Sequence, residues 1–218
     1  MKAMILAAGR GERMRPLTDC TPKPLLAVGG EPLIVRIVRA LARSGVADIV
    51  VNISHLGEQI EQALGTGAAY GVGIRYSREA VALETAGGIA LALPLLGEEP
   101  FIVVNADICT DFDFTRLHGR VGGSTRAHLV LVDNPSHHPR GDFVLAESKV
   151  QDTGEPRLTF AGIGVYAPAL FAPVERGSRH QLAPLLRAAM AADAVSGEHH
   201  RGYWSDVGTP ARLAEVDA

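Results

Sequence analysis

Two glycines and a group of cationic side chains follow the first apolar segment of the chain. Gly9 and Gly11 stand in ILAAGRGERMRPLT, residues 5–18, together with Arg13, and Lys23 follows between two prolines. Glycine lets a backbone turn tightly and approach a ligand closely, and exposed N–H groups on such a turn form a cradle for anions. Guanidinium and ammonium groups add charged contacts to phosphate oxygens. The stretch therefore predicts a polyphosphate site.

Two common phosphate-binding patterns do not fit this stretch. A Walker loop needs a lysine and a hydroxyl residue after its second glycine, and the dinucleotide pattern needs a third glycine where Met14 stands. A glycine pair by itself also suits a plain tight turn. The interpretation therefore rests on the longer string GxGxRMxPLT followed by PKP. Arg10 and Arg15 remain open between phosphate contact and a solvated surface role.

Two aspartates follow or stand within strand-like segments elsewhere in the chain. Asp107 closes the apolar run FIVVNAD, residues 101–107, and Asp206 stands in WSDVGTP, residues 204–210. A site with few protein carboxylates suits Mg²⁺ that phosphates also bind. The alternative is that Asp107 caps a helix or turn and that Asp206 pairs with an arginine.

Strand-like apolar runs alternate with helical periodicity in the first half of the chain. The patterns predict strands at 3–7, 47–54, 72–77 and 101–107, and helices at 32–43, 55–65 and from about Thr85 to Pro94. This order predicts an α/β fold with a Rossmann-like, doubly wound, mostly parallel sheet covered on both faces. Ligands of such sheets bind at the carboxyl ends of strands, where residues 9–15 and Asp107 both stand.

The pattern changes after Asp107. Strand-like runs at 127–134, 141–148 and 157–168 have few helices between them, and a helix is expected from about Leu182 to Ala192. A strand-like run at 200–208 and a short helix from Pro210 follow, and the polar stretch from Ser148 to Pro156 is interpreted as a surface loop. We expect these elements to form a small antiparallel or mixed extension of the sheet.

Length and composition exclude several other classes. A chain of 218 residues suits one globular domain. A net charge of −3 and only 5% aromatic residues disfavour a nucleic-acid partner. The apolar run after Met1 is too short for a signal sequence or a membrane span, so no membrane partner is expected. Cys20 and Cys109 show no metal-ligand spacing, which favours a reduced, cytoplasmic setting.

Four motifs together resemble the sugar-1-phosphate nucleotidyltransferases, the nucleotide-sugar pyrophosphorylases. They are LAAGRGERMRPLT with PKPL, LETAGG at 83–88, NAD at 105–107 and WSDVGTP at 204–210. The resemblance covers all 218 residues and implies the nucleotide-diphospho-sugar transferase fold in a single domain, 1–218. The nucleotide-binding half would be about 1–110 and the sugar-binding half about 111–218. The C-terminal left-handed β-helix domain of many relatives is not expected, which favours a monomer.

The resemblance also implies the reaction and the site residues. A sugar 1-phosphate attacks the α-phosphorus of a nucleoside triphosphate in line and releases pyrophosphate, so the enzyme mainly positions groups and neutralises charge. Arg13 and Lys23 would be catalytic, and Asp107 and Asp206 would hold Mg²⁺. The nucleotide would be bound by Leu6, Ala7, Ala8, Gly9, Gly11, Glu12, Arg13, Glu84, Thr85, Gly88 and Asn105.

The second half carries the clues to the sugar. By resemblance, Asp142, Thr159 and Gly162 would bind it. The runs DNPSHHPRGDF, LTFAGIGVY and SGEHHRGYWSDVGT most resemble family members that use UTP and N-acetylmuramate α-1-phosphate to make UDP-N-acetylmuramate in peptidoglycan recycling. Two alternatives remain open. One is the same transfer with another sugar or base, such as mannose 1-phosphate and GTP, and the other is a non-catalytic nucleotide-sugar binding protein.

Several other polar and aromatic residues in the second half stay without a catalytic role. Four histidines lack the spacing of zinc ligands and are interpreted as loop residues; they are His137, His138, His199 and His200. Trp204 is interpreted as a core residue or a wall of the site.

Overall fold

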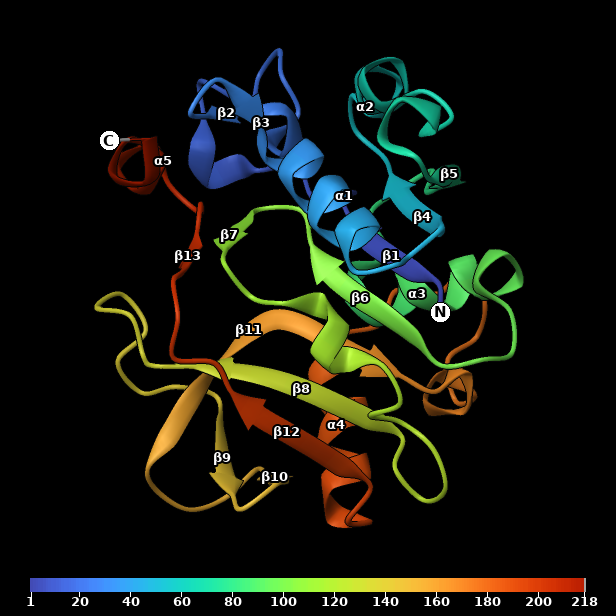
Figure 1. Cartoon of the computed structure of the whole chain (residues 1–218), viewed down its shortest axis with the longest axis vertical. Coiled ribbons are helices and arrows are strands. Elements are labelled where there is room, and N and C mark those ends of the chain that lie inside the picture. Colours follow the sequence, from blue (N-terminus) through green and yellow to red (C-terminus); the bar gives the residue numbers. More distant parts are fainter. Residues whose placement is uncertain (218) are drawn as a thin grey trace.

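Nine strands form one mixed sheet in the computed structural model, which describes residues 1–217. Helices cover both faces of this sheet, with α1 on the near face and α3 and α4 behind it (Figure 1). The strands, in their order across the sheet, are β5 (Gly73–Arg78), β4 (Asp48–Ile53), β1 (Ala3–Leu6), β6 (Phe101–Asn105), β11 (Arg157–Tyr166), β8 (Ala127–Val132), β12 (Val195–His199), β10 (Lys149–Gln151) and β9 (Phe143–Ala146).

The first half of the chain builds a parallel half-sheet from β5, β4, β1 and β6. Its connections carry the helices α1 (Leu33–Arg43), α2 (Gly57–Leu64) and α3 (Glu84–Leu96). Alternation along β1 divides the core, because successive strand side chains point to opposite faces. Ile5 packs in the cluster that holds residues of α1 and α2, whereas Met4 packs in the cluster that holds residues of α3 and α4. The predicted order of strands and helices in this half is confirmed.

In the second half of the chain, the strand direction reverses at the centre of the sheet, between β6 and β11. β11 runs antiparallel to both β6 and β8, while β12 runs parallel to β8 and β10 pairs antiparallel with β9. The five strands after β6 in the order make this half as large as the parallel one, so the expectation of a small extension on a mostly parallel sheet is wrong. An apolar strand reads the same in either direction, and its sequence therefore does not fix the orientation of its partner.

One helix boundary and two strands differ from the prediction. Pro94 lies inside α3 rather than at its end, because the final turn buries Leu96 in the core. The stretch from Ser148 to Pro156 contains β10 and is not only a loop. β12 was missed because its sequence, VSGEH, has little apolar character.

Short elements complete the chain. β7 (Ile108–Thr110) pairs with β13 (Trp204–Asp206), and β2 (Ala27–Val28) pairs with β3 (Glu31–Pro32). The remaining elements are the helices α4 (Leu182–Ala191) and α5 (Pro210–Asp217) and the 3₁₀ turns η1 (Glu12–Met14), η2 (Lys23–Leu25), η3 (Ala68–Tyr70), η4 (Phe114–Leu117) and η5 (Pro168–Phe171). No helix among residues 1–217 is long and apolar enough to cross a membrane.

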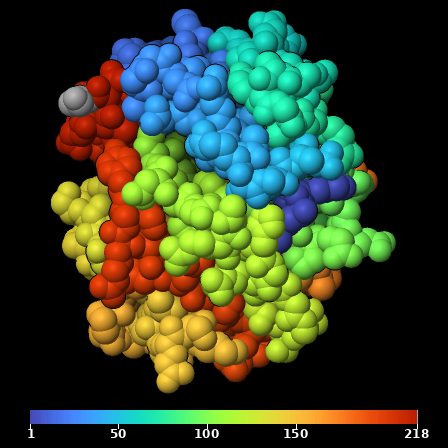
Figure 2. Space-filling model, in the orientation of Figure 1, coloured from blue at the N-terminus to red at the C-terminus, as the bar shows by residue number. Residues whose placement is uncertain are grey.

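A small third core joins the two ends of the chain. Met14, Cys109 and Val207 are buried together, and Leu213 of α5 packs against them. Figure 2 shows the C-terminal segment in red, running over the surface between the green segment that follows β6 and the yellow segment near residue 140. The first loop, β7 and the C-terminal segment are therefore held against one another.

Candidate active site

A cleft of about 610 Å³ opens where β1, β4, β5 and β6 end. Most of the residues expected to bind a nucleotide line it, as the position of ligand sites in parallel sheets predicts. From the predicted set these are Leu6, Ala7, Ala8, Gly9, Gly11, Glu12, Arg13, Lys23, Glu84, Thr85, Asn105 and Asp107.

The loop after β1 turns at Gly11. Its φ of 64° lies in the left-handed region that favours glycine, and a Cβ there would come within 3.0 Å of the Thr18 side chain. Thr18 is buried, and its Oγ1 donates to the carbonyl of Gly11 at 2.8 Å. Arg10 and Arg13 both line the cleft, whereas Arg15 pairs with Asp19 on the surface. The structure thus separates the two arginines whose role the sequence left open.

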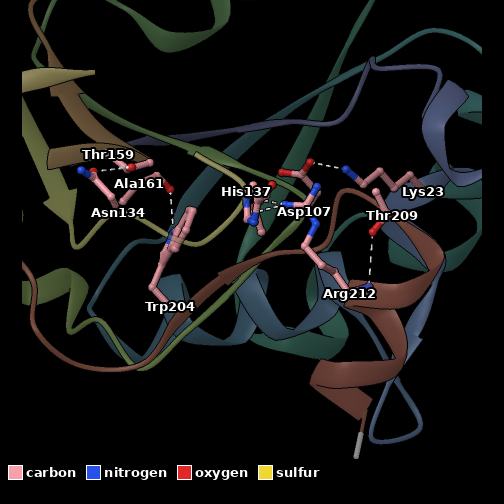
Figure 3. Close-up of polar contacts among 10 residues, drawn as sticks. Lys23, Asp107, Asn134, His137, Thr159, Ala161, Trp204, Thr209 and Arg212 are labelled. Carbon is pink, nitrogen blue, oxygen red and sulfur yellow. Dashed lines mark hydrogen bonds and ion pairs between the residues drawn. The ribbon is translucent and has the colours of Figure 1, made fainter. Parts of the chain in front are cut away.

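Lys23 and Asp107 meet inside this cleft. The Nζ of Lys23 contacts Oδ2 of Asp107, and only 11% of the Lys23 side chain is exposed (Figure 3). Lys23 begins η2, where Pro22 and Pro24 restrict the backbone on either side. The ammonium group is therefore fixed beside the carboxylate that follows β6.

Asp206 lies next to Asp107 through the pairing of β13 with β7. Asp206 stands opposite Ile108, and the N–H of Val207 donates to the carbonyl of Asp107 at 2.8 Å. The Oδ1 of Asp206 contacts the guanidinium of Arg212 and, at 2.9 Å, Nε2 of His137. Asp206 therefore does pair with an arginine, and Gly208 rather than Asp206 lines the cleft.

The carboxylate oxygens of Asp107 and Asp206 are suitable ligands for a hard divalent cation that phosphate also binds. Asp206 ends β13 and Asp107 directly precedes β7, the partner strand of β13, and the ion pairs engage only Oδ2 of Asp107 and Oδ1 of Asp206. Few protein ligands are the usual condition for Mg²⁺ that substrate phosphates also bind.

A second pocket of about 320 Å³ adjoins the cleft and shares Leu6, Glu84, Thr85 and Asn105 with it. Asp142 lines this pocket, and its Oδ2 accepts from the N–H of Phe160 at 2.8 Å while Oδ1 contacts His138. Gly162 also lines it, at a bulge in β11 where φ is 72°. A Cβ on Gly162 would lie 2.4 Å from Nδ2 of Asn105, so this glycine lets β11 approach the end of β6.

Two predicted ligand residues point elsewhere. Thr159 does not line the second pocket, because its hydroxyl donates to Oδ1 of Asn134 at 2.9 Å (Figure 3). Gly88 lies in α3 beneath the cleft, where a Cβ would come within 2.5 Å of Oε1 of Glu79. Neither residue lines the two pockets, so the sugar contact of Thr159 and the nucleotide contact of Gly88 stay predictions. Both residues serve packing behind the pockets.

Among the cleft-lining residues that sequence reasoning missed, three have polar side chains: Asn52, Glu79 and Arg179. Asn52 is a polar residue in the otherwise apolar run of β4, and Glu79 directly follows β5. Both stand at carboxyl ends of parallel strands, which is a usable signal for a ligand site. Arg179 comes from the segment before α4 and pairs with Glu84 at 2.6 Å. That pairing joins distant segments and leaves no local pattern.

The histidines divide into different environments. His137 and His138 lie in a loop, as predicted, but they contact Asp206 and Asp142. His199 belongs to β12 and pairs with Asp133, so its interpretation as a loop residue is wrong. Trp204 packs against the core, and its Nε1 donates to the carbonyl of Ala161 at 3.0 Å (Figure 3).

The sequence profile of the Nucleotidyl transferase family matches residues 2–218. The chain belongs to the nucleotidyl transferase family. This nucleotidyl transferase is 56% identical in sequence to N-acetylmuramate alpha-1-phosphate uridylyltransferase of Neisseria meningitidis serogroup B, and the match covers 100% of this chain and 97% of the relative.

More distant relatives match the chain over most of its length. Mannose-1-phosphate guanyltransferase beta-A of Xenopus laevis is 31% identical over 96% of this nucleotidyl transferase, which spans 62% of that relative. A crystal structure of a glucose-1-phosphate thymidylyltransferase from Bacillus anthracis, with sucrose, superposes with a TM-score of 0.84 at 22% identity. The superposition covers 100% of this chain and 94% of the other. This likeness shows an α/β nucleotidyltransferase fold with a mixed sheet.

Proposed function

We propose that this nucleotidyl transferase transfers UMP from UTP to N-acetylmuramate α-1-phosphate, giving UDP-N-acetylmuramate and pyrophosphate in peptidoglycan recycling. The observation that carries the proposal is the 56% identity to the meningococcal uridylyltransferase over the whole chain. The mannose-1-phosphate guanyltransferases of Xenopus laevis and Aspergillus oryzae reach only 31% and 34%.

The two adjoining pockets support a direct displacement. UTP would place its triphosphate in the larger cleft, along the loop from Gly9 to Arg13, and the sugar 1-phosphate would occupy the pocket beside Asp142. A phosphate oxygen of the sugar forms the new bond to the α-phosphorus as the bond to pyrophosphate breaks. No covalent intermediate with the protein is needed, because holding both reactants in line supplies much of the acceleration.

The cationic residues would serve the charge that develops on the phosphates. Arg13 would contact the β- and γ-phosphates and stabilise the leaving pyrophosphate. Lys23, fixed beside Asp107, would contact the α-phosphate or the sugar phosphate. Preorganised positive groups lower the barrier most where negative charge accumulates in the transition state.

Asp107 and Asp206 would hold Mg²⁺, which when bound neutralises and orients the phosphate oxygens of the nucleotide. The neighbouring cations Lys23 and Arg212 balance the same two carboxylates. We further propose that the protein works in the cytoplasm, where UTP is available. We also propose that it acts as a monomer, since one chain supplies both pockets.

The test is pyrophosphate release with Mg²⁺. It crosses UTP, GTP, CTP and dTTP with the 1-phosphates of N-acetylmuramate, N-acetylglucosamine, glucose and mannose, and a parallel series contains a chelator. We expect the highest kcat/KM for UTP with the muramate ester and no turnover without the metal. Preference for GTP with mannose 1-phosphate would refute the proposed substrates. Nucleotide binding without turnover of any pair would favour a binding protein.

A further inference from the structure

A chain of buried hydrogen bonds runs beneath the nucleotide cleft. The N–H of Ala7 donates to Oδ1 of Asn52 at 2.8 Å, and Nδ2 of Asn52 donates to Oε1 of Glu79 at 2.7 Å. The other oxygen of Glu79 accepts from the N–H of Leu83 at 2.9 Å. Asn52 and Glu79 are only 4% and 5% exposed, and both border the cleft.

This chain joins four segments that form the wall of the cleft. Ala7 begins the loop after β1, Asn52 is near the end of β4, Glu79 follows β5, and Leu83 precedes α3. The packing is shaped around the pair, because a Cβ on Gly88 would lie 2.5 Å from Oε1 of Glu79 and 2.9 Å from Nδ2 of Asn52.

We propose that Glu79 and Asn52 are positioning residues for the nucleotide. Through them, the loop that begins at Ala7 is held at a fixed distance from the segment of Leu83 and Glu84. A nucleotide in this cleft would touch both segments, one with its phosphates and the other with its base. The inference rests on the proposed nucleotide site and not on the identity of the sugar.

The donor and acceptor directions of these hydrogen bonds make the proposal specific. Both ends of the hydrogen-bond chain, Ala7 and Leu83, are N–H donors, so Asn52 and Glu79 must each turn an oxygen outward. The hydrogen bond between the two side chains then needs one donor and one acceptor. The NH₂ group of Asn52 is the donor and a carboxylate oxygen of Glu79 is the acceptor. Glu79→Gln would place two NH₂ groups against each other in every arrangement that keeps both outer bonds. Asn52→Asp would place two carboxylate oxygens against each other.

The double variant Asn52→Asp with Glu79→Gln restores the pattern. The new carboxylate at position 52 would accept from Ala7 and from the new amide at position 79, and the oxygen of that amide would accept from Leu83. The pair keeps the shape and the formal charge of the original. A role in positioning therefore predicts that two damaging substitutions repair each other.

The experiment measures nucleotide binding by calorimetry without any sugar phosphate, together with thermal melting and steady-state kinetics. It uses the full chain and the nucleoside triphosphate that wild type binds most tightly. We expect each single variant to bind it about tenfold more weakly, as for one buried polar group left without its partner. The double variant should return to within about threefold of wild type.

The kinetic readout separates positioning from folding. KM for the nucleotide should rise in the single variants, while KM for the sugar phosphate stays near the wild-type value. Glu61→Gln is the matched control, because this glutamate loses the same charge but pairs with Arg78 outside the cleft. If the single variants fail to fold, a double variant that melts and binds as wild type still supports the proposal.

Two results would overturn it. One is wild-type nucleotide affinity in Glu79→Gln, and the other is a double variant that melts as wild type yet binds as weakly as the singles. Failure of wild type to prefer UTP would instead count against the proposed substrate and leave the comparison among variants valid.

Discussion

Arg212, on the first turn of α5, donates a hydrogen bond to Oδ1 of Asp206. Only 12% of the Arg212 side chain is exposed, and its backbone N–H donates to the hydroxyl of Thr209 (Figure 3). Gly208 makes room for the guanidinium, because a Cβ there would lie 2.1 Å from Nη2 of Arg212. The run DVGTPAR thus folds so that its arginine fixes the orientation of its aspartate.

Removal of this arginine should weaken the response to Mg²⁺. We expect Arg212→Ala to raise the Mg²⁺ concentration for half-maximal activity about 10- to 100-fold, because a neighbour that orients a metal ligand has effects of that size. Gly208→Ala should act in the same direction by displacing the guanidinium. A Mg²⁺ titration of activity and Mn²⁺ binding by electron paramagnetic resonance measure both. Arg187→Ala, which breaks an exposed pair with Asp152, is the control, and wild-type titrations for both variants would contradict the expectation.

Loss of either catalytic cation should lower turnover while the fold survives. Arg13 is exposed at the cleft, so Arg13→Ala should leave the melting temperature unchanged and reduce kcat/KM about 100-fold or more. Lys23→Ala should reduce activity similarly, with a lower melting temperature because it leaves Asp107 without its partner. Arg15→Ala, on a surface pair with Asp19, should be neutral. Wild-type kcat/KM in Arg13→Ala or Lys23→Ala would remove these residues from the catalytic site.

Asp142 and Thr159 should differ in what their substitution changes. Asp142 lines the second pocket, so Asp142→Asn should raise KM for the sugar 1-phosphate about tenfold, as expected for one lost charged hydrogen bond. Thr159→Val should leave that KM unchanged and destabilise the fold by about 1 kcal/mol, because Oδ1 of the partly buried Asn134 loses its hydrogen-bond donor. Steady-state kinetics and denaturant unfolding measure the two effects. A higher KM for the sugar 1-phosphate in Thr159→Val would instead assign Thr159 to the sugar site.

Glu198, a partly buried carboxylate on β12, should make stability depend on pH in acid solution. Burial raises the pKa of Glu198, but its hydrogen bond with His128 and the nearby Arg116 guanidinium outweigh this and leave the pKa below its ordinary value. The unfolded chain therefore binds the proton more readily. The stabilisation is complete above the ordinary glutamate pKa of about 4.3 and is lost as the pH falls through the lower folded value.

Glu198→Gln should remove this dependence. We expect lower stability than wild type at pH 7 and a smaller decline of the free energy of unfolding as the solution is acidified. Urea unfolding at a series of pH values measures it, with the exposed Glu99→Gln as the control. Identical pH profiles for Glu198→Gln and wild type would assign the acid response to other groups.

Local patterns were enough to predict most elements of the first half. The apolar residues of α1 recur at 34, 37, 38 and 41 and are all buried, because helical periodicity directly marks the face that meets the core. The second half was harder to predict. β12 reads VSGEH and nevertheless pairs along its whole length with β8, because its position between two other strands overrides its weak strand propensity.

By itself, the sequence determined that Gly11, Arg13, Lys23 and Asp107 share a site. A glycine turn and the carboxyl end of a parallel strand are local features whose consequences do not depend on the rest of the fold. Only the tertiary structure decided which side chains meet beside them. Glu79 reaches Asn52 across 27 residues and Arg212 reaches His137 across 75. These partners are set by strand order and by the pairing of β7 with β13, and periodicity along the chain encodes neither.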